Sequence, residues 1–213
     1  MSSAAQKDLR RKLREQGVEF TDEDQVYLRE DTEIGRGTVI EPFVVFGPGV
    51  KIGSGCVIKA FSHLEETEIG DKCIIGPFAR VRGGSRIEAG AGIGNFVEVA
   101  RSQIGKGTTA WHLSFIGDCA AGENVEIGGG VITCNFDGVQ KNKTRLENGS
   151  FIGSNVTLVA PVTIGANALA GAGSVIDADA AADELVLGRA ELKHKSGGAA
   201  RYRQKKRQAV NNN

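Results

Sequence analysis

Branched aliphatic residues recur at almost every sixth position between Ile34 and Ile176. This period differs from the about 3.6 residues of an α-helix and from the alternation of an ordinary β-strand. A repeat of this length is typical of a parallel β-helix, in which each repeat forms a short strand and a corner and stacked neighbours bury its apolar side chain. The pattern therefore predicts an all-β solenoid over residues 31–177. The series is Ile34, Ile40, Phe46, Ile52, Ile58, Leu64, Ile69, Ile75, Val81, Ile87, Ile93, Val99, Ile104, Ala110, Ile116, Leu146, Ile152, Leu158, Ile164, Ala170 and Ile176.

The residue four places after most of these aliphatic positions is small, as a tight corner facing a narrow interior requires. Examples are Thr38, Cys56, Ala79, Ser114 and Ser174. Each inward Ile or Leu contributes about 1.5–3 kcal/mol by its burial, which must offset the entropy of ordering the coil. We therefore expect the fold to be stabilised by all the stacked apolar side chains together, and not by any single one.

Three regions depart from the repeat. Residues 1–30 carry Leu9 and Leu13 at helical spacing among charges, which predicts a short helix that caps the open end of the prism. Residues 133–145 contain an Asp-Gly turn and several cations, which predicts a protruding loop. Residues 178–213 are first acidic and then basic, and we expect an irregular tail with a disordered end.

Charge and cysteine usage exclude several classes of function. Acidic and basic residues are equal in number, 26 each, which argues against a nucleic-acid partner. The basic tail contains one aromatic residue, Tyr202, and is typical of a solvated end. The four cysteines have no metal-ligand spacing, so we expect reduced thiols and no metal. There is no apolar run of membrane-spanning length, and the chain is expected to be cytoplasmic with no membrane partner.

Five strings between Glu30 and Arg189 are more specific than a generic repeat: "IGPFARVR", "GIGNFVEV", "IGKGTTAWHLSFIGD", "GGGVITCNFDG" and "GSNVTLVAPVTIG". On these strings the chain resembles the C-terminal acetyltransferase domain of the bifunctional glucosamine-1-phosphate acetyltransferase and N-acetylglucosamine-1-phosphate uridylyltransferase, without the uridylyltransferase domain. The resemblance implies a left-handed β-helix and a homotrimer. It also implies an acetyl-CoA-dependent N-acetyltransferase that serves the biosynthesis of UDP-N-acetylglucosamine, a cell-wall precursor.

Acetyl transfer to an amine needs a base that takes the proton of the attacking nitrogen. The resemblance assigns this role to His112 in "AWHLSFIGD" and implies that Asn135 in "TCNFDG" orients the histidine and the acetyl group. The alternatives are an ordinary corner histidine and an ordinary turn asparagine. On the cofactor side, the coenzyme A contacts of the family map onto Ser154, Ala172 and Arg189, and the basic tail is a further candidate for phosphate contact.

The acceptor site matches the family less well. Arg82 and Lys141 agree with the residues that hold the amino-sugar phosphate, whereas the remaining positions read Ala100, Phe115 and Glu126 where the family has lysine, tyrosine and asparagine. A lost cation and a gained anion disfavour a phosphate dianion. Arg101 adjoins Ala100, but neighbouring strand residues point to opposite faces.

Three functions follow from this pattern. Glucosamine-1-phosphate is the leading acceptor because the match is long and its strings are specific. Glu126 beside the altered positions leaves open a different amino sugar or amine, whose ammonium that carboxylate pairs with. A non-catalytic trimeric scaffold is the third reading, and the retained His112 and cofactor positions argue against it.

Overall fold

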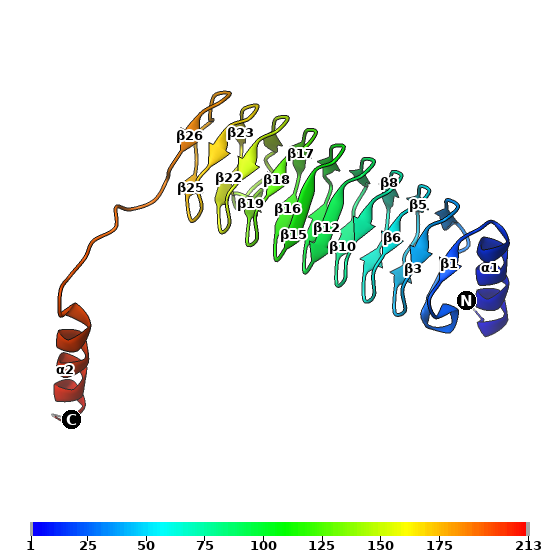
Figure 1. Ribbon diagram of the computed structural model, residues 1–213, viewed down its shortest axis with the longest axis horizontal. Helices are drawn as coiled ribbons and strands as arrows, with labels where there is room; N and C mark the ends of the chain where they lie inside the picture. The colour runs from blue at the N-terminus through cyan, green and yellow to red at the C-terminus, as the bar shows by residue number, and fades with distance from the viewer. Residues whose placement is uncertain (1, 212–213) are drawn as a thin grey trace.

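The computed structural model describes residues 2–211, which form a long three-sided prism with one helix against its N-terminal end and a second helix set apart from it by an extended segment (Figure 1). Three parallel sheets of ten, eight and eight strands run along the prism, and each coil adds one strand to each sheet in turn. Residues at equivalent positions of successive coils are therefore hydrogen-bonded neighbours, as in the series Ile52, Ile69 and Ile87. The predicted parallel β-helix is confirmed.

The ten-stranded sheet, sheet A, consists of β1 (Glu19–Phe20), β3 (Val39–Ile40), β6 (Val57–Ile58), β9 (Ile74–Ile75), β12 (Gly92–Asn95), β15 (Thr109–His112), β18 (Glu126–Ile127), β21 (Phe151–Ile152), β24 (Leu169–Ala170) and β26 (Leu185–Val186). Sheet B consists of β4 (Val45–Phe46), β7 (His63–Leu64), β10 (Arg80–Arg82), β13 (Glu98–Ala100), β16 (Phe115–Gly117), β19 (Ile132–Cys134), β22 (Thr157–Val159) and β25 (Val175–Ile176). Sheet C consists of β2 (Glu33–Ile34), β5 (Val50–Ile52), β8 (Thr67–Ile69), β11 (Ser85–Ile87), β14 (Gln103–Ile104), β17 (Cys119–Ala121), β20 (Thr144–Leu146) and β23 (Val162–Ile164).

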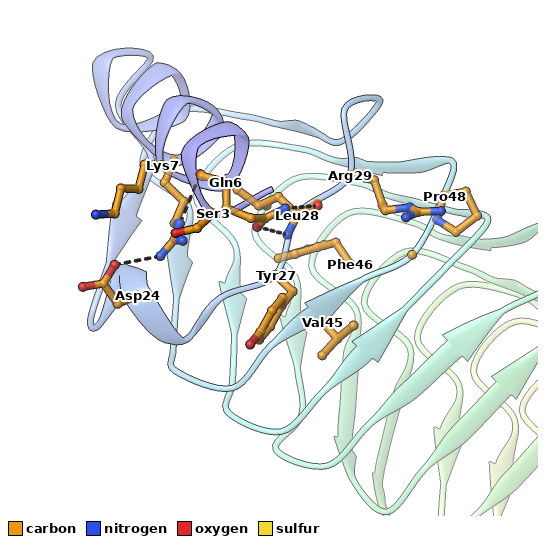
Figure 2. A pocket seen from close by; sticks show the side chains of 12 residues that line it. Ser3, Gln6, Lys7, Asp24, Tyr27, Leu28, Arg29, Val45, Phe46 and Pro48 are labelled. Carbon is orange, nitrogen blue, oxygen red and sulfur yellow. Dashed lines mark hydrogen bonds and ion pairs between the residues drawn. The ribbon is translucent and has the colours of Figure 1, made fainter. Parts of the chain in front are cut away.

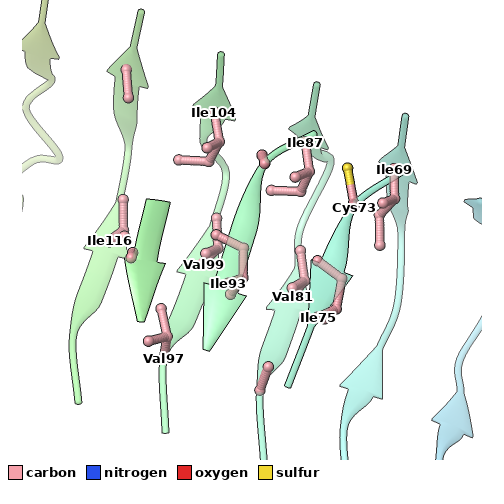
Figure 3. Close-up of a cluster of buried hydrophobic side chains, with 14 of the residues drawn as sticks. Ile69, Cys73, Ile75, Val81, Ile87, Ile93, Val97, Val99, Ile104 and Ile116 are labelled. Carbon is pink, nitrogen blue, oxygen red and sulfur yellow. The ribbon is translucent and has the colours of Figure 1, made fainter. Parts of the chain in front are cut away.

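The core is a set of apolar columns along the prism axis (Figure 3). Every aliphatic position of the six-residue series is buried, and so are most of the small corner residues four places later. The stretch where the series is interrupted still contains a complete coil, whose inward residues are Ala121, Ile127 and Thr133. The sheets also extend past residues 31–177, because β1 and β26 pair through their backbones without the aliphatic repeat.

The N-terminal end of the prism is capped by α1 (Ser3–Glu15), as expected. Leu13 is buried against the first coil. The amide of Gln6 donates to the carbonyl of Leu28 at 2.8 Å and accepts from its N–H at 3.0 Å, which imitates a strand pair. A short 3₁₀ helix, η1 (Glu23–Gln25), follows. A groove of about 660 Å³ remains beneath α1, between Lys7, Tyr27 and Phe46 (Figure 2).

The tail is not irregular throughout, and the disorder expected at its end stays a prediction. Residues Gly198–Asn211 form α2, which projects away from the prism in Figure 1. Its Ala, Arg, Lys and Gln residues are strong helix formers, and Gly197 takes a left-handed conformation (φ 67°) before it. Residues 1, 212 and 213, which the expected terminal segments include, lie outside the described residues. No helix within residues 2–211 is long and apolar enough to cross a membrane.

Candidate active site

His112 lies at the corner where sheet A meets sheet B, at the end of β15. Its register partner on the preceding coil is Asn95, the last residue of β12. The two side chains are hydrogen-bonded, with 2.7 Å between His112 Nδ1 and Asn95 Oδ1. The imidazole is exposed, so its second nitrogen is open to a ligand. Asn95 was not singled out in the sequence, although its contact follows from the register.

Strand register brings two of the three predicted cofactor residues, Ser154 and Ala172, into line with His112. Ala110, Ile127, Ile152 and Ala170 are successive partners in sheet A. Two residues further along each strand, the same alignment stacks His112, Gly129, Ser154 and Ala172 in one column. Coils repeat every ~4.8 Å, so Ser154 lies about 10 Å and Ala172 about 14 Å from His112 along the axis.

Arg189 joins the far end of this column by donating from Nη1 to the carbonyl of Ala172 at 2.8 Å. Between the two ends, Gly129 lies directly beside His112, because a Cβ added at Gly129 would lie 3.3 Å from His112 Cβ. The adjacent corner positions are Gly130, Asn155 and Gly173, all with positive φ. A Cβ at Gly173 would meet nothing within 4 Å, whereas one at Gly130 would lie 2.2 Å from Asn155 Oδ1. Most side chains on this half of the corner are therefore small.

The other half of the same corner, on the N-terminal side of His112, is built of aromatic rings. The rings belong to four phenylalanines on successive coils, Phe43, Phe61, Phe78 and Phe96. Neighbouring rings stack with centroids 4.9, 4.8 and 5.0 Å apart and nearly parallel planes. Their exposed fractions are 47, 50, 44 and 56%, and each backbone has a positive φ. Leu113 continues the series beside His112. We call the four rings the phenylalanine ladder: Phe43, Phe61, Phe78 and Phe96.

A second polar cluster occupies the opposite end of sheet B, where it turns into sheet C. Arg101 donates to both carboxylate oxygens of Asp118, from Nε at 2.9 Å and from Nη2 at 2.8 Å. Asn135 also donates to Asp118 through its side-chain amide. Arg101 is the main cause of the lowered pKa of the Asp118 carboxyl, and Asn135 and the charge of Lys141 lower it further. Asn135 is thus held by Asp118 and not by His112 of the same chain.

Arg82 lies at the end of β10, on the coil before Arg101. Its Nε donates to Glu98 at 2.7 Å, and both side chains are about one-third exposed. Ala100 is buried between Arg82 and Gly117, its partners on the coils to either side. Arg101 is committed to Asp118, so its guanidinium does not take the place of a cation at Ala100.

The predicted acceptor residues fall on two faces of the prism. Phe115 points outward from sheet B, and the end of its ring lies near Gly117. Arg82, Asn135 and Lys141 share that face or its far corner. Glu126 instead lies on the outer side of sheet A, between Thr109 and Phe151. One small acceptor bound to sheet B therefore does not reach Glu126 of the same chain.

The loop that carries Lys141 is a compact turn organised by Asp137. This carboxylate accepts from the N–H groups of Val139 and Gln140, both at 2.8 Å, and from the amide of Asn142 at 2.8 Å. These bonds lower the pKa of Asp137. Within residues 2–211 no three His, Cys, Asp or Glu side chains gather as a metal site, and the four cysteines are free thiols.

Comparisons with known proteins agree with this architecture. Residues 31–65 and 66–101 match the family model described as bacterial transferase hexapeptide (six repeats). The chain is 56% identical over 204 residues to the "Bifunctional protein GlmU" of Bradyrhizobium diazoefficiens, covering 96% of this chain and 45% of that protein. The protein of the same name from Agrobacterium fabrum is 46% identical over 196 residues, with 92% and 43% covered. The chain thus spans about half the length of the curated relatives it matches.

Two solved structures share the fold at low sequence identity. LpxA from Bacteroides fragilis, a UDP-N-acetylglucosamine acyltransferase, superposes with a TM-score of 0.64 at 17% identity, covering 73% of this chain and 66% of that one. LpxA from Acinetobacter baumannii gives 0.58 at 15% identity, covering 78% and 70%. At these identities the likeness concerns the fold alone.

Proposed function

The chain belongs to the hexapeptide-repeat transferases, in the family of the proteins called Bifunctional protein GlmU, and on that premise we propose that it is an acetyl-CoA-dependent N-acetyltransferase. The acceptor that we propose is glucosamine-1-phosphate. The observation that carries the proposal is the single column that joins exposed His112 to Ser154, Ala172 and Arg189.

The column supplies what acetyl transfer requires. The small side chains beyond His112 leave space for an extended thioester chain, and Arg189 at the far end of the column offers a cation to the phosphates of coenzyme A. The acceptor amine attacks the thioester carbonyl and His112 Nε2 takes its proton. The C–S bond then breaks, and the proton passes from the imidazolium to the leaving thiolate.

Arg82 and Lys141 are the cations that we assign to the acceptor phosphate. Arg82 is already paired with Glu98, so a phosphate must compete with or displace that carboxylate. The separation of Glu126 from sheet B removes it as a source of repulsion within one chain.

We propose a homotrimer, as the resemblance implies, in which neighbouring prisms complete the site. The phenylalanine ladder supports this, because its four adjoining rings are about half exposed and form one contiguous apolar strip, a feature of protein interfaces. The division of the predicted acceptor residues between sheets A and B supports it too. A neighbouring prism would bring a second face against His112. The cytoplasmic location stays a prediction.

The test of the activity is thiol release from acetyl-CoA with glucosamine-1-phosphate, beside unphosphorylated and nucleotide-linked amino sugars. We expect turnover on the sugar phosphate that falls at least about a hundredfold in His112→Ala. The matched control is His63→Ala, which changes a half-buried histidine on sheet B. Turnover only on another amine would replace the acceptor, and full activity of His112→Ala would remove the proposed base.

The test of assembly is sedimentation velocity on the intact chain. We expect a species of three times the chain mass of 22.4 kDa, and its loss when Phe61 and Phe78 are both changed to Asp. Tyr27→Asp alters an exposed aromatic residue outside the ladder and should leave the trimer intact. A monomeric wild type would contradict the trimer, and a trimeric double variant would move the interface elsewhere.

A further inference from the structure

The imidazole of His112 is held from one side only. Its Nδ1 lies 2.7 Å from Asn95 Oδ1, and Nε2 has no hydrogen-bond partner within residues 2–211. Asn95 also binds the residue after His112 through its backbone, because its carbonyl accepts a hydrogen bond from the N–H of Leu113 at 2.9 Å. The side chain and the main chain of one asparagine therefore fix two consecutive residues of the next coil.

This contact determines where the imidazole proton resides. An amide oxygen only accepts hydrogen bonds, so Nδ1 must carry the proton when it bonds to Asn95 Oδ1. The lone pair of the neutral ring then lies on Nε2, the nitrogen that faces solvent. Without a partner at Nδ1, a histidine in water favours the opposite tautomer, whose Nε2 already bears a proton and accepts none.

Asn95 differs in kind from the residues at the same corner on earlier coils. Those residues are Pro42, Ala60 and Pro77, which follow from the register of Ile40, Ile58, Ile75 and Ile93 in sheet A. None of their side chains has a hydrogen-bonding group. The change from an apolar to an amide side chain occurs at the single coil that lies directly beneath His112.

We propose that Asn95 is a positioning residue for acetyl transfer, which holds His112 in the Nδ1–H tautomer and aims its Nε2 lone pair at the acceptor amine. The inference rests on the proposed function for its catalytic meaning. The tautomer itself is a property of the free protein and is open to measurement without any substrate.

The first experiment is nitrogen-15 NMR of the histidine rings in the intact chain, above the ordinary imidazole pKa of about 6.5. The chain has three histidines, and His112→Gln assigns the signal. We expect the Nδ1–H tautomer in the wild type, its loss in Asn95→Ala, and its retention in Asn95→Asp, since a carboxylate also accepts. An unchanged tautomer in Asn95→Ala would overturn the proposal.

Asn148→Ala is the matched control, because Asn148 also ties adjacent coils by accepting the N–H of Glu123 at 2.9 Å. It should cost similar stability and leave the ring of His112 unchanged. Loss of the tautomer in this control as well would mean that the effect reports general loosening, and would overturn the specific role of Asn95.

The second experiment separates this proposal from the activity itself. In Asn95→Ala we expect kcat to fall about tenfold, the size of one lost hydrogen bond, while KM for acetyl-CoA stays within about twofold. If His112→Ala is inactive and Asn95→Ala keeps the wild-type kcat after losing the tautomer, Asn95 has no positioning role. If His112→Ala is fully active, the proposed function fails, whereas the NMR result on Asn95 still stands.

Discussion

Arg101 and Asp118 form a bidentate ion pair between adjacent coils, in which Arg101 Nε lies 2.9 Å from Asp118 Oδ1 and Arg101 Nη2 lies 2.8 Å from Asp118 Oδ2. Both residues take a left-handed backbone conformation, with φ of 52° and 50°. The pair fastens the corner at which the loop of Asn135 and Lys141 leaves the prism. It therefore acts on the shape of the predicted acceptor site without being part of it.

Changing Asp118 to Asn should destabilise the fold by about 1.5–3 kcal/mol at neutral pH, the usual value of a hydrogen bond to a charged group. Because folding lowers the pKa of this carboxyl, its stabilisation is complete above the ordinary carboxyl pKa of about 4 and is lost as pH falls through the folded-state pKa. Urea unfolding of the wild type and the variant should therefore give curves that converge below about pH 4.

An exposed ion pair provides the comparison for that experiment. Arg11 and Asp8 lie 3.0 Å apart on α1, and both side chains are more than 60% exposed. Asp8→Asn should change stability by less than about 0.5 kcal/mol at any pH, because solvent screens such pairs. Equal losses in Asp8→Asn and Asp118→Asn would contradict the special role of the corner pair.

In the phenylalanine ladder we expect a glycine variant to be more stable than the alanine variant at the same position, the opposite of the usual order. Phe61 has a φ of 61°, where an L-residue pays about 1–2 kcal/mol and glycine does not. Phe61→Gly and Phe61→Ala lose the same ring contacts, so the glycine variant should be more stable by about 1 kcal/mol. Thermal unfolding of the two variants measures this difference. A more stable alanine variant would mean that the corner relaxes out of the left-handed conformation.

Two glycines should respond very differently to a single methyl group. A Cβ at Gly94 would lie 1.9 Å from the carbonyl oxygen of Trp111, which is backbone and has little freedom to move. Gly94→Ala should therefore cost about 3 kcal/mol or more. At Gly84 the same atom would meet nothing within 4 Å, and only its positive φ opposes the change. Gly84→Ala should cost about 1 kcal/mol in the same denaturant titration.

Arg189 is predicted to bind the phosphates of coenzyme A. Its removal should raise KM for acetyl-CoA about tenfold to a hundredfold and lower kcat little, since a charged hydrogen bond stabilises by about 1.5–3 kcal/mol. Arg201→Ala in α2 is the control for a general loss of positive charge. Initial rates over a range of acetyl-CoA concentrations distinguish the two. An equal effect of both variants would assign the contact to the basic tail as a whole.

The sequence predicted the prism because its inward positions follow one rule. A residue such as Ile93 or Leu158 must be apolar wherever coils stack, and no distant contact alters that demand. The same holds for the cap, since Leu9 and Leu13 mark the buried side of α1. Local rules were enough here because each coil contacts only its neighbours.

The rest of the site depends on register between coils, which single positions do not reveal. Asn95 lies 17 residues before His112, and only the pairing of β12 with β15 brings their side chains together. Asp118 gave no signal either, because "GDC" resembles many corners. The left-handed phenylalanines were not expected because glycine and asparagine normally occupy that conformation. The irregular tail was predicted from its charges, whereas α2 forms because its residues have high helix propensities.

In the column that joins His112 to Arg189, the number of coils between the two residues sets the distance between the proposed base and the cofactor anchors. Each added coil between β18 and β21 would carry the cofactor anchors about 4.8 Å further from the base, beyond the reach of any fixed donor. The same coil inserted between β4 and β7 would lengthen the molecule and leave that distance unchanged. The site therefore tolerates growth of the chain on one side of His112 and forbids it on the other.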